Sequence, residues 1–267
     1  MSGSDMSDER ACYSPAIRTN RLRLPAGVTT ARLGLGMVGA GLPTDAALAF
    51  TLDHARARDA VQRPLDLSVL HGDCTGLGLE IVRVDSAAQD RQVYLRRPDY
   101  GRRLCDNSRA ALTARQPCSS DVILVVGDGL SSTAVQAGAP GLLAVLVQKL
   151  YGLGLSVGPL VLASQARVAL ADEIGSLLGA RLSIILIGER PGLSASDSLG
   201  AYLTWGPCPG RTDAERNCVS NIRPGGLDAD VAASKLTWLT QMALQFGLSG
   251  VSLKDESTVV GSAIAAT

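Results

Sequence analysis

The sequence has few of the features that mark several common classes of protein. Aromatic residues make up 3% of its 267 residues. The longest apolar run, near residues 141–147, is far shorter than the roughly 20 residues that a membrane-spanning helix needs. Lysine plus arginine equals aspartate plus glutamate at 25 each, so no net charge attracts nucleic acid or an anionic membrane. We therefore expect no binding to nucleic acid and no membrane span.

Metal ligands and paired thiols are also sparse. The six cysteines are scattered without a C-x-x-C pair, and the two histidines, His54 and His71, have no metal-ligand spacing. The N-terminus is polar and lacks the apolar segment of a signal peptide. We expect a cytoplasmic protein with free thiols and no metal site.

The sequence does contain a regular alternation of strand and helix patterns. Short apolar runs predict buried strands over residues 122–126, 159–163 and 184–187. Helical patterns over residues 140–151 and 168–178 separate them. This order predicts an α/β fold with a mainly parallel sheet and right-handed crossovers.

Further elements are predicted on either side of this alternation. Residues 79–84 alternate like a half-buried strand, and residues 45–61 form a helical pattern. A last amphipathic helix over residues 228–246 ends before Gly247, and residues 251–253 are consistent with one more strand.

Polar residues follow two of the buried strands, where open α/β sheets hold their ligands. Asp128 and Glu189 each come just after a strand, and residues 217–223 are rich in side-chain donors and acceptors. Asp128 either faces a ligand or caps the next helix, and Glu189 is either a general base or a hydrogen-bond acceptor. Ser131 lacks a nucleophile elbow, so we predict a polar ligand site without a catalytic residue.

A glycine-rich motif and an arginine cluster each allow two interpretations. Gly34, Gly36 and Gly39 form G-x-G-x-x-G, which would suggest a nicotinamide-dependent dehydrogenase. No apolar strand precedes the motif and no helix opens on its last glycine, which favours a structural or partner-facing loop. The arginines of residues 94–104 form either a solvated face or a contact surface for an acidic partner or a phosphate.

Long stretches of the chain, from residue 21 to residue 253, resemble the small subunit of adenosylcobalamin-dependent ethanolamine ammonia-lyase. The matching stretches are RLRLPAGVTTARLGLG, GLPT, LAFTLDHARARDAV, SAAQDRQVYLRRPDYGRRL, DGLSS, DEIGSLLGARLSIILIGERPGLSASDSLG and RTDAERNCVSNIRPGG. Their length and order identify the chain as a member of that family.

The resemblance implies a modified Rossmann-like domain that covers one side of adenosylcobalamin, while a TIM-barrel large subunit holds the substrate. The two subunits, in a higher-order hetero-oligomer, convert ethanolamine to acetaldehyde and ammonia through an adenosyl radical. The cofactor is held base-on, so this chain supplies no cobalt ligand, and Asp-x-His-x-x-Gly is absent. By the resemblance, the cobalamin contacts of this chain are Val168, Glu189 and Cys218.

The same resemblance sets the expected division of the chain. We expect a flexible arm (1–20), a helical and irregular partner-contacting region (21–115), the cobalamin-binding domain (116–253) and a flexible tail (254–267). Met37 stands where the resemblance leads us to expect a basic residue. The family is associated with bacterial microcompartments, which allows encapsulation of this chain, although the long N-terminal extension that directs some members there is not evident. A non-catalytic scaffold that binds the large subunit without touching cofactor is the main alternative.

Overall fold

The computed structural model describes residues 17–18, 32–117, 119–193, 195 and 197–257. Contacts divide the chain into two compact units, residues 1–55 and 56–267, and the division falls inside helix α1 (Thr44–Gln62). Most of the expected N-terminal arm and of the tail lies outside the described residues. The expected boundaries at residues 20, 115 and 253 remain predictions.

The first unit contains a two-stranded antiparallel sheet and the first part of α1. Strand β1 (Ile17–Arg18) pairs with β2 (Met37–Val38). Helix α1 confirms the helix predicted over residues 45–61, but Leu48 and Leu52 on it are 64% and 51% exposed. Because these side chains remain exposed, the unit has an uncovered apolar surface.

The glycine-rich motif lies within this hairpin region and does not have the arrangement of a dinucleotide-binding loop. Gly34, Gly36 and Gly39 all have positive φ, between 61° and 82°. Residues 32–36 form no strand, β2 lies between Gly36 and Gly39, and α1 begins only at Thr44. Within the described residues, these three glycines therefore allow the backbone to turn.

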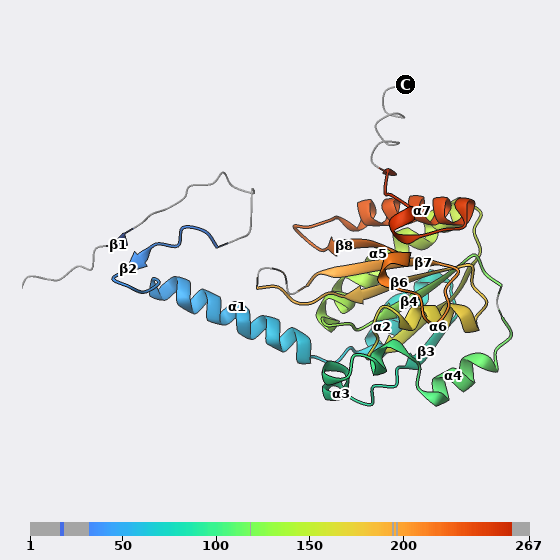
Figure 1. Ribbon diagram of the computed structural model, residues 1–267, viewed down its shortest axis with the longest axis horizontal. Helices are drawn as coiled ribbons and strands as arrows, with labels where there is room; N and C mark the ends of the chain where they lie inside the picture. Colours follow the sequence, from blue (N-terminus) through green and yellow to red (C-terminus); the bar gives the residue numbers. More distant parts are fainter. Residues whose placement is uncertain (1–16, 19–31, 118, 194, 196, 258–267) are drawn as a thin grey trace, which may run out of the picture. The chain divides into compact units, whose positions relative to one another are not determined.

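The second unit is built on a six-stranded sheet (Figure 1). The strand order in this sheet is β3-β5-β4-β6-β7-β8. The first four strands in this order are parallel, and the last two are antiparallel to their neighbours. The predicted α/β fold and mainly parallel sheet are confirmed, whereas β7 and β8 are additional strands. The strands are β3 (Ile81–Asp85), β4 (Val122–Gly127), β5 (Val157–Ser164), β6 (Leu182–Gly188), β7 (Leu199–Trp205) and β8 (Arg216–Ile222).

Helices cover both faces of this sheet, so its central strands are buried on both sides. In β4, Leu124 packs into the cluster under α5 (Ser132–Gly152) and α7 (Ala229–Phe246), while Val125 packs into the cluster under α6 (Leu170–Leu177). This alternation is the period-two geometry of a strand. The other helices are α2 (Leu67–Cys74), η1 (Thr75–Leu77), α3 (Arg91–Arg96), η2 (Tyr100–Arg102), α4 (Asp106–Thr113), η3 (Asp213–Glu215) and η4 (Gly250–Ser252).

Helix α5 begins well before the predicted start at residue 140. Ser131 caps it by accepting a hydrogen bond from the Ala134 N–H at 3.2 Å, and Pro140 lies inside the helix. Proline removes a backbone donor, which normally interrupts a helix. Here apolar side chains on both sides of Pro140 are buried, including Val135 and Leu142, and their packing keeps the helix continuous.

The C-terminal elements confirm one prediction and correct another. Helix α7 ends at Phe246, and the next residue, Gly247, has a φ of 67°, the left-handed conformation expected after a helix. The strand expected at residues 251–253 is instead the 3-10 helix η4, because Asn217 binds the Gly250 N–H and the Leu253 carbonyl. Among the described helices, none is both long and apolar enough to span a bilayer.

A buried ion pair connects α6 to β8. The guanidinium of Arg216 donates to Asp172 Oδ1 at 2.7 Å, and both side chains are at most 2% exposed. Arg216 also donates to Thr204 Oγ1 on β7 and to the Arg211 carbonyl. The charges are therefore compensated inside the protein rather than by water.

Candidate functional site

The carboxyl ends of β4, β5 and β6 meet at a cavity of about 440 Å³. Helices α5 and α6, which follow β4 and β5, lie on opposite faces of the sheet, so this is the topological switch point where such sheets bind ligands. The cavity is lined by Tyr94, Gly129, Leu130, Arg167, Val168, Ile187, Gly188, Glu189, Arg190 and Tyr202.

Two glycines allow the strand ends to approach closely at this cavity. A Cβ on Gly129, where φ is 58°, would lie 2.2 Å from the Gly188 carbonyl oxygen. A Cβ on Gly188 would lie 2.0 Å from the Ser131 carbonyl oxygen. Only glycine fits these two positions, and the Leu130 N–H donates to the Gly188 carbonyl at 2.9 Å.

Glu189 extends from the end of β6 as a half-buried carboxylate that lines the cavity. Its Oε2 accepts hydrogen bonds from Ser198 Oγ at 2.5 Å and from the Asn221 N–H at 3.4 Å. Its backbone N–H donates to the Ser198 carbonyl at 3.0 Å. Within the described residues, no hydrogen bond is made to Oε1, so this oxygen is free to accept one from a ligand.

Val168 lies on the loop between β5 and α6 and forms an apolar wall of the same cavity. The neighbouring Arg167 holds this loop against η2 and α3. Its backbone N–H donates to the Gly101 carbonyl at 2.8 Å, and its guanidinium donates to the Tyr94 carbonyl and lies 4.3 Å from the centre of the Tyr94 ring. The structure thus brings Val168 and Glu189 to one cavity.

Cys218 is not among the residues that line the cavity, but it lies next to one that is. It lies on β8 directly opposite Tyr202 of β7, and Tyr202 lines the cavity. Burial, followed by Cys218, raises the pKa of Tyr202, and burial also raises the pKa of Cys218. Tyr202 is a site residue that the sequence analysis missed, because a single tyrosine in an apolar run resembles a core residue.

Asp128 is buried and does not line the cavity, and it is not the N-cap of α5. Its carboxylate is 3% exposed and accepts from the N–H groups of Gly129, Gln165 and Ala166 at 2.8–3.0 Å. Arg91 adds a contact at 3.4 Å. Burial raises the pKa of Asp128 to about 6, although these hydrogen bonds oppose the shift. Asp128 therefore connects the β4 and β5 loops beneath the cavity, and Ser131 rather than Asp128 caps α5.

The polar segment at residues 217–223 contributes less to the site than the sequence suggests. Asn217 is bonded to Gly250 and Leu253, and Arg223 donates to Asn221 Oδ1 at 2.8 Å. Only the backbone N–H of Asn221 reaches Glu189. These side chains stabilise β8 and the following turn.

The arginine cluster is partly used within the protein. Arg97 pairs with Asp99 at 2.8 Å, and both Arg97 and Arg103 stack on the Tyr100 ring. Arg96 and Arg102 are exposed. Binding of an acidic partner or a phosphate here remains a prediction.

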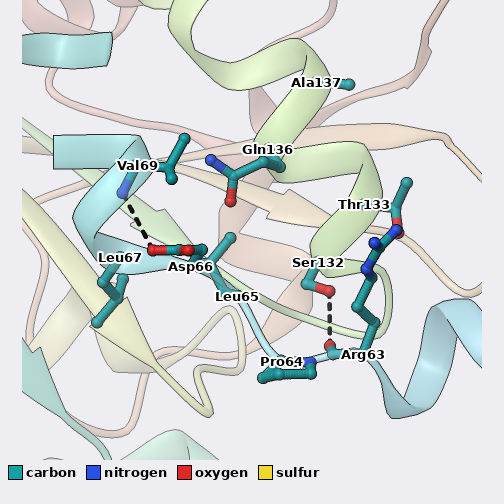
Figure 2. A pocket seen from close by; sticks show the side chains of 10 residues that line it. All are labelled: Arg63, Pro64, Leu65, Asp66, Leu67, Val69, Ser132, Thr133, Gln136 and Ala137. Carbon is teal, nitrogen blue, oxygen red and sulfur yellow. Dashed lines mark hydrogen bonds between the residues drawn. The ribbon is translucent and has the colours of Figure 1, made fainter. Parts of the chain in front are cut away.

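A larger hollow of about 710 Å³ lies between the segment after α1, helix α2 and the first turns of α5 (Figure 2). Two of its polar groups make contacts within the fold: Asp66 caps α2, and Ser132 Oγ donates to the Arg63 carbonyl at 2.6 Å. None of the three predicted cofactor contacts lines it. Across the described residues, no group of three or more histidine, cysteine or acidic side chains could hold a metal ion.

The comparisons with known proteins agree on one family. A family model described as ethanolamine ammonia-lyase light chain (EutC) matches residues 20–254. The ethanolamine ammonia-lyase small subunit of Rhodopseudomonas palustris (strain BisA53) is 54% identical over 243 residues, covering 91% of this chain and 93% of that protein. The small subunits of Bradyrhizobium diazoefficiens (54% over 232 residues; 86% and 88% covered) and Azotobacter vinelandii (51% over 235; 87% and 87%) are similar as well. The chain therefore belongs to the ethanolamine ammonia-lyase light-chain family.

Proposed function

We propose that this chain, together with a large subunit, binds adenosylcobalamin at the cavity at the ends of β4, β5 and β6. The observation that carries the proposal is the convergence of Val168 and Glu189 at the switch point of the sheet, with Cys218 on β8 opposite Tyr202 of the same cavity. When bound, the cofactor supplies the radical chemistry that converts ethanolamine to acetaldehyde and ammonia.

The side chains of the cavity suit the edge of a corrin, which is rimmed with carboxamides and methyl groups. Val168, Leu130 and Ile187 provide an apolar wall, and Glu189 Oε1 provides an acceptor for an amide N–H. A cavity of about 440 Å³ encloses only part of such a ligand. The remainder has to be covered by another chain, and we assign that role, with the substrate site, to the large subunit. Neither histidine lines the cavity, which is compatible with base-on binding.

The test is gel filtration with adenosylcobalamin, with and without the large subunit, following the corrin absorbance. We expect cofactor and ethanolamine turnover in the two-subunit complex. If the complex forms and turns over ethanolamine, and the Glu189 variants described next still bind cofactor normally, the result favours the scaffold alternative. Failure of the chain to join the large subunit would contradict the proposal altogether.

Glu189→Ala is expected to weaken adenosylcobalamin binding about 10- to 100-fold, the usual value of a hydrogen bond to a charged group. Cys218→Ala is the matched control and should weaken it about 3-fold or less, because the thiol is a weak partner that does not line the cavity. Equilibrium dialysis of the two-subunit complex measures both constants. Equal losses in the two variants would contradict the assignment of Glu189.

The exposed apolar residues of the first unit are a candidate surface for the large subunit. They are each 38–64% exposed: Leu33, Leu35, Met37, Leu42, Leu48, Phe50 and Leu52. A surface of this kind on an isolated chain promotes aggregation. We expect the double variant Leu48→Gln/Phe50→Gln to make the isolated chain more soluble and to weaken its association with the large subunit. Unchanged association, measured by analytical ultracentrifugation, would place the interface elsewhere.

A further inference from the structure

Arg91, the first residue of α3, places its guanidinium where the end of α1 meets the loops that follow β4 and β5. The side chain is 12% exposed. Its Nε donates to the Val61 carbonyl at 2.7 Å, and its Nη1 donates to the Gly129 carbonyl at 2.8 Å. Nη1 also lies 3.4 Å from Asp128 Oδ2 and 3.4 Å from Gln165 Oε1. One side chain therefore joins α3 to three other segments of the second unit.

The contact to Val61 suits the end of a helix. The last four carbonyls of an α-helix have no partner within the helix, and a cation is favourable beside them. Val61 is the penultimate residue of α1, and the last turn of α1 has no basic residue of its own. Arg91 therefore supplies the missing charge from another element, and this contact anchors the guanidinium on one side.

The contact to Gly129 reaches the wall of the candidate cavity. Gly129 and Leu130 both line this cavity, whereas Arg91 does not. The Gly129 N–H donates to Asp128 Oδ1 at 3.0 Å, and its carbonyl accepts from Arg91. The next N–H, that of Leu130, donates to the Gly188 carbonyl at 2.9 Å. The backbone of the wall is thus held by three hydrogen bonds, and Arg91 supplies the one that comes from a helix.

Two unfavourable features occur at this arginine. Its remaining terminal nitrogen, Nη2, is buried and makes no hydrogen bond within the described residues. Gln165 has a φ of 53°, a left-handed conformation that is uncommon for residues other than glycine. Such features persist where the surrounding contacts determine them, and they concentrate at functional sites. The guanidinium is therefore placed for its contacts to the backbone, although one of its own donors stays unpaired.

We propose that Arg91 is a positioning residue for the candidate cavity, because it holds the Gly129 carbonyl and with it the wall formed by Gly129 and Leu130. Arg91 acts through this backbone and does not touch the ligand. The inference rests on the proposed function, because it assumes that this cavity takes the corrin edge.

The experiment measures adenosylcobalamin binding to the two-subunit complex by equilibrium dialysis, which gives both Kd and the number of binding sites. Arg91→Lys keeps the charge, but a single nitrogen cannot occupy the positions of both Nε and Nη1. We expect Arg91→Lys to raise Kd about 3- to 10-fold and Arg91→Gln to raise it about 10-fold or more, with the number of sites unchanged. A role in folding alone would reduce the number of sites and leave Kd unchanged.

Hydrogen exchange of the Leu130 N–H provides a readout that needs no cofactor. A loosened wall breaks its hydrogen bond to Gly188 more often and exposes it to water. In the cofactor-free complex, we expect Arg91→Lys to speed up this exchange about 3- to 10-fold. Mass spectrometry of peptic peptides that cover residues 128–131 measures the rate.

Arg109→Lys is the matched control. The Arg109 guanidinium also joins an acidic side chain to a backbone carbonyl, since it donates to Glu173 at 2.6 Å and to the Leu104 carbonyl at 3.0 Å. It lies on α4 and does not line the candidate cavity. Kd and the exchange of Leu130 should therefore stay within about 2-fold of the wild type.

The outcomes distinguish the inference from the proposed function. If the wild-type complex binds adenosylcobalamin and both Arg91 variants bind it with the same Kd, the inference is overturned and the proposed function stands. Unchanged exchange of Leu130 in Arg91→Lys overturns the inference in the same way. If the wild-type complex binds no corrinoid at all, the proposed function fails and the inference fails with it.

Discussion

Replacing Arg216 by alanine is expected to lower the free energy of unfolding by about 3–5 kcal/mol, because it leaves Asp172 as an uncompensated buried charge. Both side chains are at most 2% exposed, and burial already raises the pKa of Asp172. Urea denaturation monitored by circular dichroism measures the change. If the transition remains two-state, the slope of the unfolding free energy against urea concentration should not change.

An exposed pair of the same chemistry provides the control. Arg97 and Asp99 are 55% and 53% exposed, so Arg97→Ala should lower the free energy of unfolding far less than Arg216→Ala. The double variant Arg216→Met/Asp172→Leu should recover most of the stability lost in Arg216→Ala, since it leaves no buried charge. A cost for Arg216→Ala similar to that for Arg97→Ala would show that the buried pair is not important for stability.

Asp128→Ala is the second substitution with a large expected effect, a loss of at least about 3 kcal/mol in the free energy of unfolding. It leaves three backbone N–H groups and part of the Arg91 guanidinium without their acceptor, at roughly 1–3 kcal/mol for each buried group. Because these groups hold the β4 and β5 loops together, the variant should also bind adenosylcobalamin more weakly in the two-subunit complex. Full stability of the variant would contradict this account.

The pKa of Asp128 adds a test that depends on pH. The folded-state pKa is raised to about 6 from the ordinary 3.8, so the folded protein holds this proton more tightly than the unfolded chain. Protonation of Asp128 therefore contributes its full stabilisation to the fold below the unfolded pKa, and this stabilisation is lost as the pH rises through 6. The stability of the wild type relative to Asp128→Asn, which does not titrate, should fall by about 1–2 kcal/mol between pH 5 and pH 7.5. If the relative stability rises over this range, the pKa of Asp128 is lowered by folding and not raised.

The sequence predicts the parts of the fold that depend on local pattern. The strands β4, β5 and β6 are nearly continuous apolar runs, which is the pattern of strands buried on both faces. Strand β8 was missed because its exposed positions, such as Ser220 and Asn221, make it read as a polar loop. The start of α5 was misplaced because Pro140 is a helix breaker by local rules, whereas packing on both sides of it decides the structure.

The candidate site was predictable only in part for a related reason. Glu189 follows a recognisable buried strand, so its position at a strand end can be expected from the sequence. The role of Asp128 cannot be predicted from the sequence, because its partners Gln165 and Ala166 lie on a different loop. Tyr202 lines the cavity because β7 pairs with β6, and no local pattern shows that pairing.

The strand order has a consequence for how the protein is made on the ribosome. Strand β3 is an edge strand whose partner in the sheet is β5, and Ile81 pairs with Leu160. Until residues 157–164 have emerged from the ribosome, β3 has no partner strand in the sheet. Non-local pairings of this kind delay folding and leave apolar segments uncovered during synthesis. Chaperone contacts during translation should therefore concentrate on the segment between β3 and β5 and diminish once β5 has emerged.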